Sequence, residues 1–290
     1  MDTHPDIFLL RGHARSGTNW IGRLLNLHPR VLCAGEWDFT ELQDAFGRFV
    51  GALARCPRRP GAPSRARRSS GLPLRVLAVV CERKPGAIWI GERTPKPIEP
   101  TPIAEAPVIH VLRDGRDVLV SWTHHQLKRA RTGEGGLAGR MGEQVAAYER
   151  NAEHFLEHPE HLLSDESWVR QIARQWGARN LADRDTIESA RAGRTPYRVH
   201  ALRYEDLLAD VERERVGMYR FLALDPDEAA PLESGVKTGA GFESESPGAF
   251  NRKGEAGDWK NYFTGDARRW FKEEAGSALI ELGYEERNDW

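Results

Sequence analysis

Short apolar runs alternate with segments of helical periodicity along most of this sequence. The first run, DIFLLR at 6–11, predicts a strand buried on both faces, and within 18–28 the residues Trp20, Ile21 and Leu24 recur at helical spacing. The same reading predicts a turn and short strand over 28–36, a strand over 107–113, helices over 114–127 and 167–184, a strand leading into a helix over 197–208, and a loop followed by a helix over 249–274. This alternation predicts an α/β fold in which helices flank a central, mostly parallel sheet.

Two segments interrupt the alternation. Residues 55–68 read RCPRRPGAPSRARR, which predicts a flexible arginine-rich insert near 55–70, and the glycines that follow the helix of 114–127 predict a second flexible loop near 131–142. The apolar run at 74–81 fits a helix or a strand equally well. The 290 residues suit one large α/β domain or two small ones, and we interpret 1–290 as a single domain.

Composition narrows the class of protein. A hydrophobic content of 40% is enough for a buried core, and a formal net charge of −1 argues against a general nucleic-acid binder, which would be basic. The three cysteines, Cys33, Cys56 and Cys81, lie far apart and form no CxxC pair, so a reducing compartment is favoured over a disulfide framework. With neither a signal peptide nor a membrane span recognisable, we expect a cytoplasmic protein.

The segment RGHARSGTNW at 11–20 has the form of a phosphate-binding turn between a strand and a helix. Gly12 and Gly17 have the spacing of a P-loop, but Thr18 and Asn19 follow where that motif has lysine and then serine or threonine. The backbone N–H groups of residues 16–19 would open the helix and suit an anion, while Arg15 supplies the positive charge. Loss of the lysine and of the magnesium ligand indicates a single phosphate-like group and no metal. A plain strand–turn–helix connection is the alternative, although it explains Arg15 poorly.

Two further segments carry anion ligands. In LRDGRDVLVS at 112–121, Arg113 ends a strand and Ser121 lies eight residues later, although RDGRD is equally consistent with a solvated turn. In NRKGEAGDWKN at 251–261, Arg252 and Lys253 precede Gly254, which fits an anion clamp or a charged surface loop.

Taken together, these segments resemble the PAPS-dependent sulfotransferases, where PAPS is 3′-phosphoadenosine 5′-phosphosulfate. ARSGTNW is similar to the family's 5′-phosphosulfate loop, which has Lys or Arg before SGTTW, and RDGRDVLVS is similar to its 3′-phosphate segment RDPRDVxVS. RKGEAGDWKNYF resembles the signature RKGxxGDWKNxF, and RYEDL at 203–207 resembles the YED element near the adenine. The four segments occur in the family's order between about residues 6 and 271, with poor agreement over roughly 45–75 and 128–165.

The resemblance implies a P-loop-like sulfotransferase fold and roles for individual residues. PAPS would donate the sulfuryl group, PAP (3′-phosphoadenosine 5′-phosphate) would be the product, and no metal would be required. Arg15 would stabilise the leaving phosphate, with Ser16, Gly17, Thr18 and Asn19 around the 5′ end. Trp20 and Tyr204 would contact the adenine, although Trp20 fits a core position as well. The 3′-phosphate would be held by Arg113, Ser121, Arg252, Lys253 and Gly254.

An acceptor hydroxyl or amine needs a general base. The cytosolic branch has a histidine in a KTH element, but GERTPKP at 91–97 has no histidine at the comparable place. NLHPRVLCAGEWDF at 26–39 resembles the HPxVRCGEE segment of the tyrosylprotein branch and puts Glu36 at the position of its base; burial can tune such a carboxylate. A surface role is the alternative for Glu36, Glu92 is the reserve base, and Arg93 would assist the leaving group. The acceptor itself is a small molecule, a glycan or a peptide.

Other interpretations lead to different experiments. His154, His158 and His161 lie close together in HFLEHPEH, but Pro159 interrupts the pattern and no fourth ligand is evident, so we predict no metal site. A small-molecule kinase of related fold is the alternative enzyme, and turnover without magnesium would argue against it. A protein that binds PAPS or PAP without turnover is the non-enzymatic alternative.

Overall fold

The computed structural model describes residues 5–33, 35–36, 48, 84–99, 106–131, 141–232 and 254–290. Five strands in these ranges form one sheet in the order β2-β3-β1-β4-β5, and every neighbouring pair is parallel. The strands are β1 (Asp6–Gly12), β2 (Val31–Cys33), β3 (Trp89–Glu92), β4 (Val108–Leu112) and β5 (Val199–Arg203). The α/β class and the parallel sheet expected from the sequence are therefore confirmed.

The central strand β1 is buried on both faces, as its continuous apolar run predicts. Phe8 and Leu10 pack into one hydrophobic cluster, whereas Leu9 points to the opposite face and packs with Val108 of β4. All three side chains are fully buried, because successive residues of a strand face opposite sides of the sheet. Helices must therefore cover both faces of the sheet.

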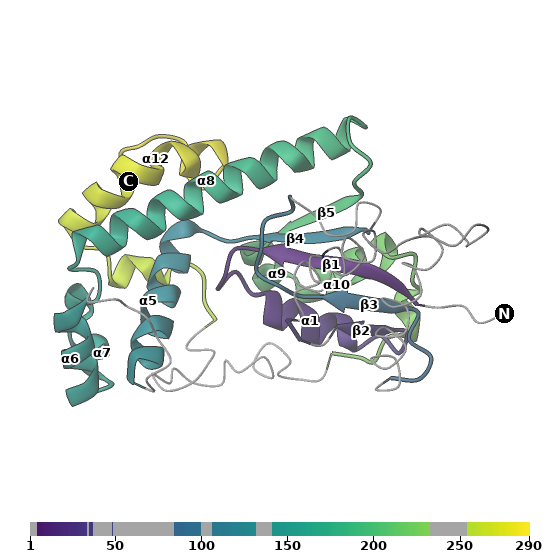
Figure 1. The fold of residues 1–290 in the computed structure, drawn as a ribbon, viewed down its shortest axis with the longest axis horizontal. Coiled ribbons are helices and arrows are strands. Elements are labelled where there is room, and N and C mark those ends of the chain that lie inside the picture. Colours follow the sequence, from purple (N-terminus) through teal and green to yellow (C-terminus); the bar gives the residue numbers. More distant parts are fainter. Residues whose placement is uncertain are drawn as a thin grey trace, which may run out of the picture.

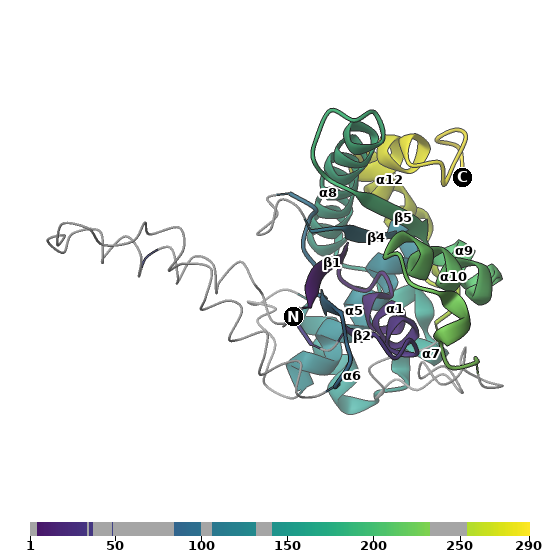
Figure 2. The ribbon, with the colours of Figure 1, turned by 90° about the vertical axis from the view of Figure 1, so that its right-hand side faces the viewer.

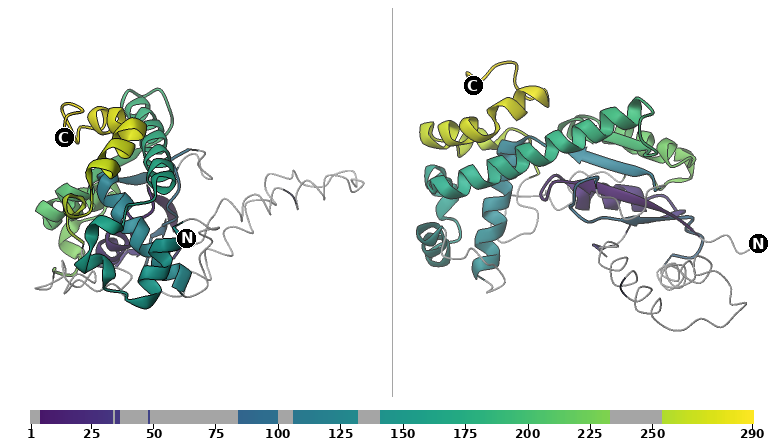
Figure 3. Two further views of the ribbon diagram at one scale, coloured as in Figure 1. Left: turned by 90° about the vertical axis from the view of Figure 1, so that its left-hand side faces the viewer. Right: turned by 45° about the horizontal axis from the view of Figure 1, so that its top comes forward.

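Helices on the two faces meet this requirement. On one face α1 (Thr18–Asn26) and α10 (Val211–Phe221) contact each other and the strands (Figure 2). On the other face lies α8 (Glu166–Arg191), and α12 (Gly265–Glu281) runs beside it (Figures 1 and 3). The apolar side of α8 includes Trp168, Ile172 and Trp176, the stripe that helical periodicity predicts.

A group of helices extends from the carboxyl end of the sheet. β4 leads directly into α5 (Gly115–Arg131), and α6 (Gly142–Arg150) and α7 (His154–Glu157) lie beside it (Figure 1). None of the helices in the described ranges is long and apolar enough to cross a bilayer. The remaining elements are α9 (Tyr204–Ala209) and three 3-10 helices, η1 (Pro159–His161), η2 (Pro226–Glu228) and η3 (Asp258–Asn261).

Several boundaries differ from the sequence predictions. The helix after β4 continues to Arg131, and α8 runs seven residues past the predicted end, from 184 to Arg191. Strand β3 was not predicted, because four residues carry too little alternation to stand out from a loop. The arginine-rich insert near 55–70, the run at 74–81 and most of the glycine-rich loop near 131–142 lie outside the described residues.

Candidate functional site

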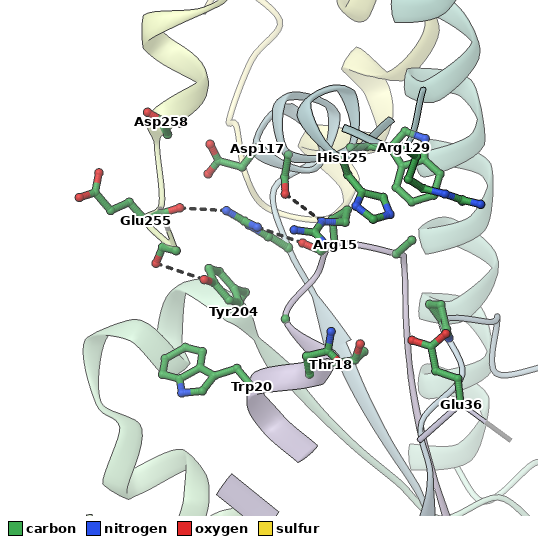
Figure 4. Close-up of a pocket in the computed structure, with 18 residues that line it drawn as sticks. Arg15, Thr18, Trp20, Glu36, Asp117, His125, Arg129, Tyr204, Glu255 and Asp258 are labelled. Carbon is green, nitrogen blue, oxygen red and sulfur yellow. Dashed lines mark hydrogen bonds between the residues drawn. The ribbon is translucent and has the colours of Figure 1, made fainter. Parts of the chain in front are cut away.

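A cavity of about 280 Å³ opens beyond the carboxyl ends of β1 and β4, where parallel sheets usually bind ligands. Loop and helix residues from distant parts of the sequence surround it (Figure 4). Its lining consists of Ala14, Arg15, Gly17, Thr18, Asn19, Trp20, Glu36, Pro95, Arg113, Asp117, Ser121, Trp122, His125, Arg129, Tyr204, Gly254, Glu255 and Asp258.

The loop between β1 and α1 forms one wall, and its backbone has two left-handed residues. Arg15 has φ 70°, a conformation that is costly for a side chain other than glycine, and Gly17 has φ 94° at the N-cap of α1. A Cβ on Gly17 would lie 2.6 Å from the Tyr204 ring, so only glycine lets the loop approach that ring closely. The Ser16 side chain is fully buried below the loop, and its hydroxyl has no hydrogen-bond partner among the described residues. The first N–H groups of a helix have no partner within it, and Gly17, Thr18 and Asn19 at the start of α1 line the cavity.

Two arginines connect the loop to the neighbouring wall. Arg15 donates from Nε to the Ser121 hydroxyl at 3.1 Å, and Arg113 donates from Nη1 to the Arg15 carbonyl at 2.9 Å. The Arg113 guanidinium also lies over the Tyr204 ring, 4.3 Å from its centroid, and donates from Nη2 to the Glu255 carbonyl at 2.9 Å. The buried Nε of Arg113 has no hydrogen-bond partner in the described structure. Two guanidinium groups and a hydroxyl thus converge where an anion can be held.

The residues beside Tyr204 hold this arrangement in place. Glu205 accepts a hydrogen bond from the Asp114 backbone N–H at 2.9 Å and another from the Tyr284 hydroxyl at 3.1 Å. Burial raises the pKa of Glu205. The Tyr204 hydroxyl donates to the Gly254 carbonyl at 3.1 Å, and its ring meets Trp20 edge-on with centroids 5.8 Å apart. The RYEDL segment therefore fixes the start of α5 as well as one wall of the cavity.

The first turn of α5 joins the site to the segment at 257–259. Asp117 accepts hydrogen bonds from the backbone N–H groups of Gly257 at 2.7 Å and Trp259 at 2.9 Å. Burial raises the pKa of Asp117, and the neighbouring positive charge of Arg113 opposes that shift. The Arg116 guanidinium pairs with Asp114 at 2.7 Å and stacks 3.9 Å above the Trp259 ring. The two predicted 3′-phosphate segments are thus held against each other.

The structure brings most of the sequence-predicted residues into one place. The lining includes Arg15, Gly17, Thr18, Asn19, Trp20, Glu36, Arg113, Ser121, Tyr204 and Gly254, whereas Ser16, in the same loop, is fully buried and not part of the lining. Trp20 lines the cavity and is also only 2% exposed within a core cluster, so both interpretations of this residue describe part of its environment. Glu36 is exposed at the cavity wall. Arg252 and Lys253 lie outside the described residues.

Two candidates lie elsewhere. Arg93 is not part of the cavity lining; its side chain packs under α1, where a Cβ on Gly22 would lie 3.0 Å from Arg93 Cδ. Glu92, the reserve base, is fully buried, pairs with Arg11 and accepts a hydrogen bond from the Thr94 hydroxyl. Both carboxylate oxygens of Glu92 are therefore engaged inside the protein. Their placement does not support a catalytic role for either residue.

The structure also adds residues that sequence reasoning missed. Trp122, His125 and Arg129 line the cavity from the same helix as Ser121. Burial, together with the positive charges of Arg15, Arg129 and Lys128, lowers the pKa of His125 to about 4. The spacing of 121, 125 and 129 by four residues places them on one helical face, which was the available signal in the sequence. The other unpredicted lining residues are Ala14, Pro95, Asp117, Glu255 and Asp258.

Comparisons with known proteins identify the family and the fold. The chain matches the family described as sulfotransferase domain over residues 104–283. A mouse sulfotransferase, SULT7A1, solved with PAP, has 17% sequence identity and a TM-score of 0.53, covering 97% of this chain and 86% of that one. At this identity the likeness establishes the fold alone. A sulfotransferase domain from the curacin biosynthetic pathway has 16% identity and a TM-score of 0.48, with 97% and 98% of the two chains covered.

Proposed function

The chain belongs to the sulfotransferase domain family, and on this basis we propose how its cavity transfers a sulfuryl group from PAPS to an acceptor. The enzyme is a PAPS-dependent sulfotransferase. The observation that supports the residue assignments is the convergence of Arg15, Arg113, Ser121 and Tyr204 on one cavity, although they come from three separate segments of the sequence. The family match favours sulfuryl transfer over the kinase alternative, because the matching family is a sulfotransferase domain.

One end of the cavity is suited to the 3′-phosphate of the nucleotide. Arg113 and Ser121 lie here, and the unpartnered, buried Nε of Arg113 is a donor available to an anion. Arg252 and Lys253 remain proposed ligands of the same phosphate. Tyr204 and Trp20 form the adjoining aromatic wall and would contact the adenine. The contacts of Asp117 with the segment at 257–259 keep this end of the site assembled.

The loop at 15–19 would act on the leaving group. When PAPS is bound it supplies the sulfuryl group, and negative charge grows on the departing phosphate as the sulfur–oxygen bond breaks. Arg15 is the cation of this loop, and the backbone N–H groups of Thr18 and Asn19 begin α1 at the positive end of its dipole. Donors held in place before the reaction stabilise this charge without reorganising, and removal of one typically costs about 10²–10³ in rate.

The acceptor must lose a proton as the new bond forms, and Glu36 is the base we propose. It lines the cavity on the same side as His125 and Arg129, away from Trp20 and Tyr204 (Figure 4). His125 is the second candidate, because burial and nearby cations lower its pKa to about 4 and keep the imidazole neutral near pH 7. A neutral imidazole can accept a proton, but the low pKa makes it a weaker base than one tuned near neutrality.

The acceptor end of the cavity has a mixed lining. Glu36, His125 and Arg129 provide charged and polar groups, while Trp122 and Pro95 provide apolar surface. We therefore propose a polar acceptor whose hydroxyl or amine belongs to a small molecule, a glycan or a peptide. A simple phenol with no other polar group is less suited to this lining. A panel of acceptors that differ only in an acidic substituent would test this, since equal kcat/KM across the panel would contradict it.

The proposal includes no metal requirement and a cytoplasmic location. Thr18 and Asn19 stand where magnesium-dependent loops have lysine and the metal-binding hydroxyl. Turnover that is unchanged by EDTA is the expected result, and loss of activity that magnesium restores would contradict it. Cys33 is buried as a free thiol, which fits a reducing compartment. Cell fractionation would test the location.

Calorimetric titration with PAP in the absence of magnesium is the first test. We expect binding by the wild-type protein that is greatly weakened in Arg15→Ala and Arg113→Ala. The control is Arg269→Ala, which removes an exposed arginine on α12 that pairs with nearby Asp266 at 2.9 Å. Transfer of sulfate from PAPS to an acceptor then separates an enzyme from a protein that only binds the nucleotide. Tight PAP binding with no turnover on any acceptor would favour the binding protein.

A further inference from the structure

A cluster of imidazole rings lies on the surface at α7 and η1, outside the cavity. The rings of His154, His158 and His161 have centroids 5.0–5.4 Å apart. The carboxylate of Glu160 stands between two of them, 3.6 Å from His158 Nδ1 and 3.6 Å from His161 Nε2. None of these residues lines the cavity. The sulfotransferase reaction therefore gives no reason for this arrangement.

We propose that His158, Glu160 and His161 form a binding site for a divalent transition-metal ion such as Zn²⁺. One ligand atom from each of the three residues lies within 4.8 Å of the other two. Ligands about 2.0–2.2 Å from a tetrahedral zinc ion are roughly 3.3–3.6 Å apart, so the two nitrogen–oxygen distances already match an occupied site. Small side-chain rotations would close the third edge. Imidazole and carboxylate groups are a ligand set that zinc commonly accepts.

His154 would position one of the ligands. Its Nε2 lies 3.2 Å from His161 Nδ1, the ring nitrogen of His161 that does not face Glu160. If His161 Nδ1 donates its proton to His154, then His161 Nε2 is left with a lone pair directed toward Glu160. A metal-bound histidine commonly donates its other N–H in this way, which fixes the tautomer and the ring orientation. This arrangement gives each of the three histidines a role, although only His158 and His161 would contact the ion.

The chain geometry makes the site local and accessible. The helix α7 ends just before Pro159, which cannot continue a regular helix and instead begins the 3-10 helix η1. The resulting tight turn brings His158 and His161 together. Pro159 is also the residue that interrupts the helical spacing of the histidines, which is why the sequence alone predicts no metal site here. The side chains of His158, Glu160 and His161 are 51%, 52% and 55% exposed, which leaves room for an ion and for water as a further ligand.

The test is titration of the metal-free full-length protein with Zn²⁺, in competition with a chromophoric chelator. We expect saturable binding of about one ion per chain that is lost in the double variant His158→Gln/His161→Gln. Glu160→Gln should also weaken binding, and His154→Gln should weaken it by about 10–100-fold through loss of orientation. Glu153→Gln, an exposed carboxylate beside the cluster, is the matched control and should bind as the wild type does.

Thermal unfolding with and without zinc provides a second, independent test of binding at this cluster. Because zinc would bind the folded chain, it should raise the melting temperature of the wild type and of Glu153→Gln but not that of the double variant. Equal melting temperatures without zinc would show that the exposed substitutions leave the fold intact. Absence of saturable binding, or binding that persists in the double variant, would overturn the proposal.

Discussion

Arg15 and Ser121 are hydrogen-bonded at 3.1 Å although 106 residues separate them in the sequence. Arg15 belongs to the loop that would hold the 5′ end of the nucleotide, and Ser121 belongs to the helix that would hold the 3′-phosphate. The contact therefore joins the two proposed phosphate sites directly. It also holds the Arg15 side chain across the cavity, while its left-handed backbone directs its carbonyl to Arg113.

Substitutions at the two ends of this contact should both weaken PAP binding, but only the Arg15 variant should lose most of its kcat. Arg15→Ala removes the charge beside the leaving group and should lower kcat by about 10²–10³. Ser121→Ala removes a hydroxyl from the 3′-phosphate site and should raise the Kd for PAP by roughly 10–100-fold, the value of a hydrogen bond to a charged group, with a much smaller change in kcat. Steady-state kinetics at saturating PAPS and calorimetry with PAP measure the two effects. Equal losses of kcat in both variants would contradict the division of roles.

Two substitutions decide the identity of the general base. Glu36→Gln should lower kcat by about 10²–10⁴ and leave PAP binding unchanged, because it removes proton acceptance and not a phosphate contact. His125→Gln should have a smaller effect on kcat. Glu149→Gln, an exposed carboxylate on α6, serves as the control. The larger loss of kcat in His125→Gln would transfer the role to the histidine.

The free energy of unfolding should decrease as the pH is lowered, over a range set by the buried side chain of His13. Burial, reinforced by the nearby charge of Arg179, lowers the pKa of His13 to about 4, whereas the unfolded value is 6.5. Below pH 6.5 the unfolded chain takes up the proton and the folded chain does not, so this contribution to stability is present above 6.5 and is lost as pH falls toward 4. The difference corresponds to roughly 3 kcal/mol.

Denaturant unfolding of the wild type and of His13→Gln between pH 7 and pH 4 tests this linkage. The variant should lose less free energy of unfolding over that range than the wild type. His161→Gln, at an exposed position, should follow the wild-type curve when a chelator is present. Parallel curves for the wild type and His13→Gln would show that the histidine is not responsible.

Gly115 should tolerate no side chain. A Cβ at this position would lie 2.4 Å from the Trp176 ring, which is fully buried and donates from Nε1 to the Arg113 carbonyl at 3.1 Å. Gly115→Ala should therefore reduce the free energy of unfolding by about 1–3 kcal/mol and disturb Arg113. Gly265→Ala is the matched control, because nothing lies within 4 Å of its added Cβ. Denaturant unfolding with PAP titration measures both effects, and equal stability of the two variants would contradict the prediction.

Local signals in the sequence were sufficient for much of the fold and for the phosphate loop. The buried run of β1 and the turn at Arg15 and Gly17 are each encoded by adjacent residues, so a strand, a turn and a helix could be predicted in order. Strand β3 was missed because Trp89–Glu92 is short and gains its stability from β1 and β2. Its pairing depends on residues far away in the sequence.

Placement of individual side chains was harder to predict. Arg93 follows β3 directly, and the family resemblance assigns it to the leaving group, but the absence of a side chain on Gly22 opens space for it under α1. That space depends on how a helix packs, which a linear pattern does not show. His125 was not among the predicted site residues. Its spacing of four residues from Ser121 places both on one face of α5, but only the fold shows that this face lines the cavity.

The order of strands in the sheet also determines how the chain can assemble during synthesis. β1 is made first, yet it pairs with β3 and β4, so Asp6 meets Trp89 and Leu9 meets Val108. The apolar strand β1 therefore leaves the ribosome before β3 and β4, the two strands with which it pairs, have been synthesised. Long-range parallel pairing of this kind slows folding and exposes the chain to aggregation in the meantime. We expect the yield of folded protein to depend on chaperones and on translation speed through the first hundred or so residues.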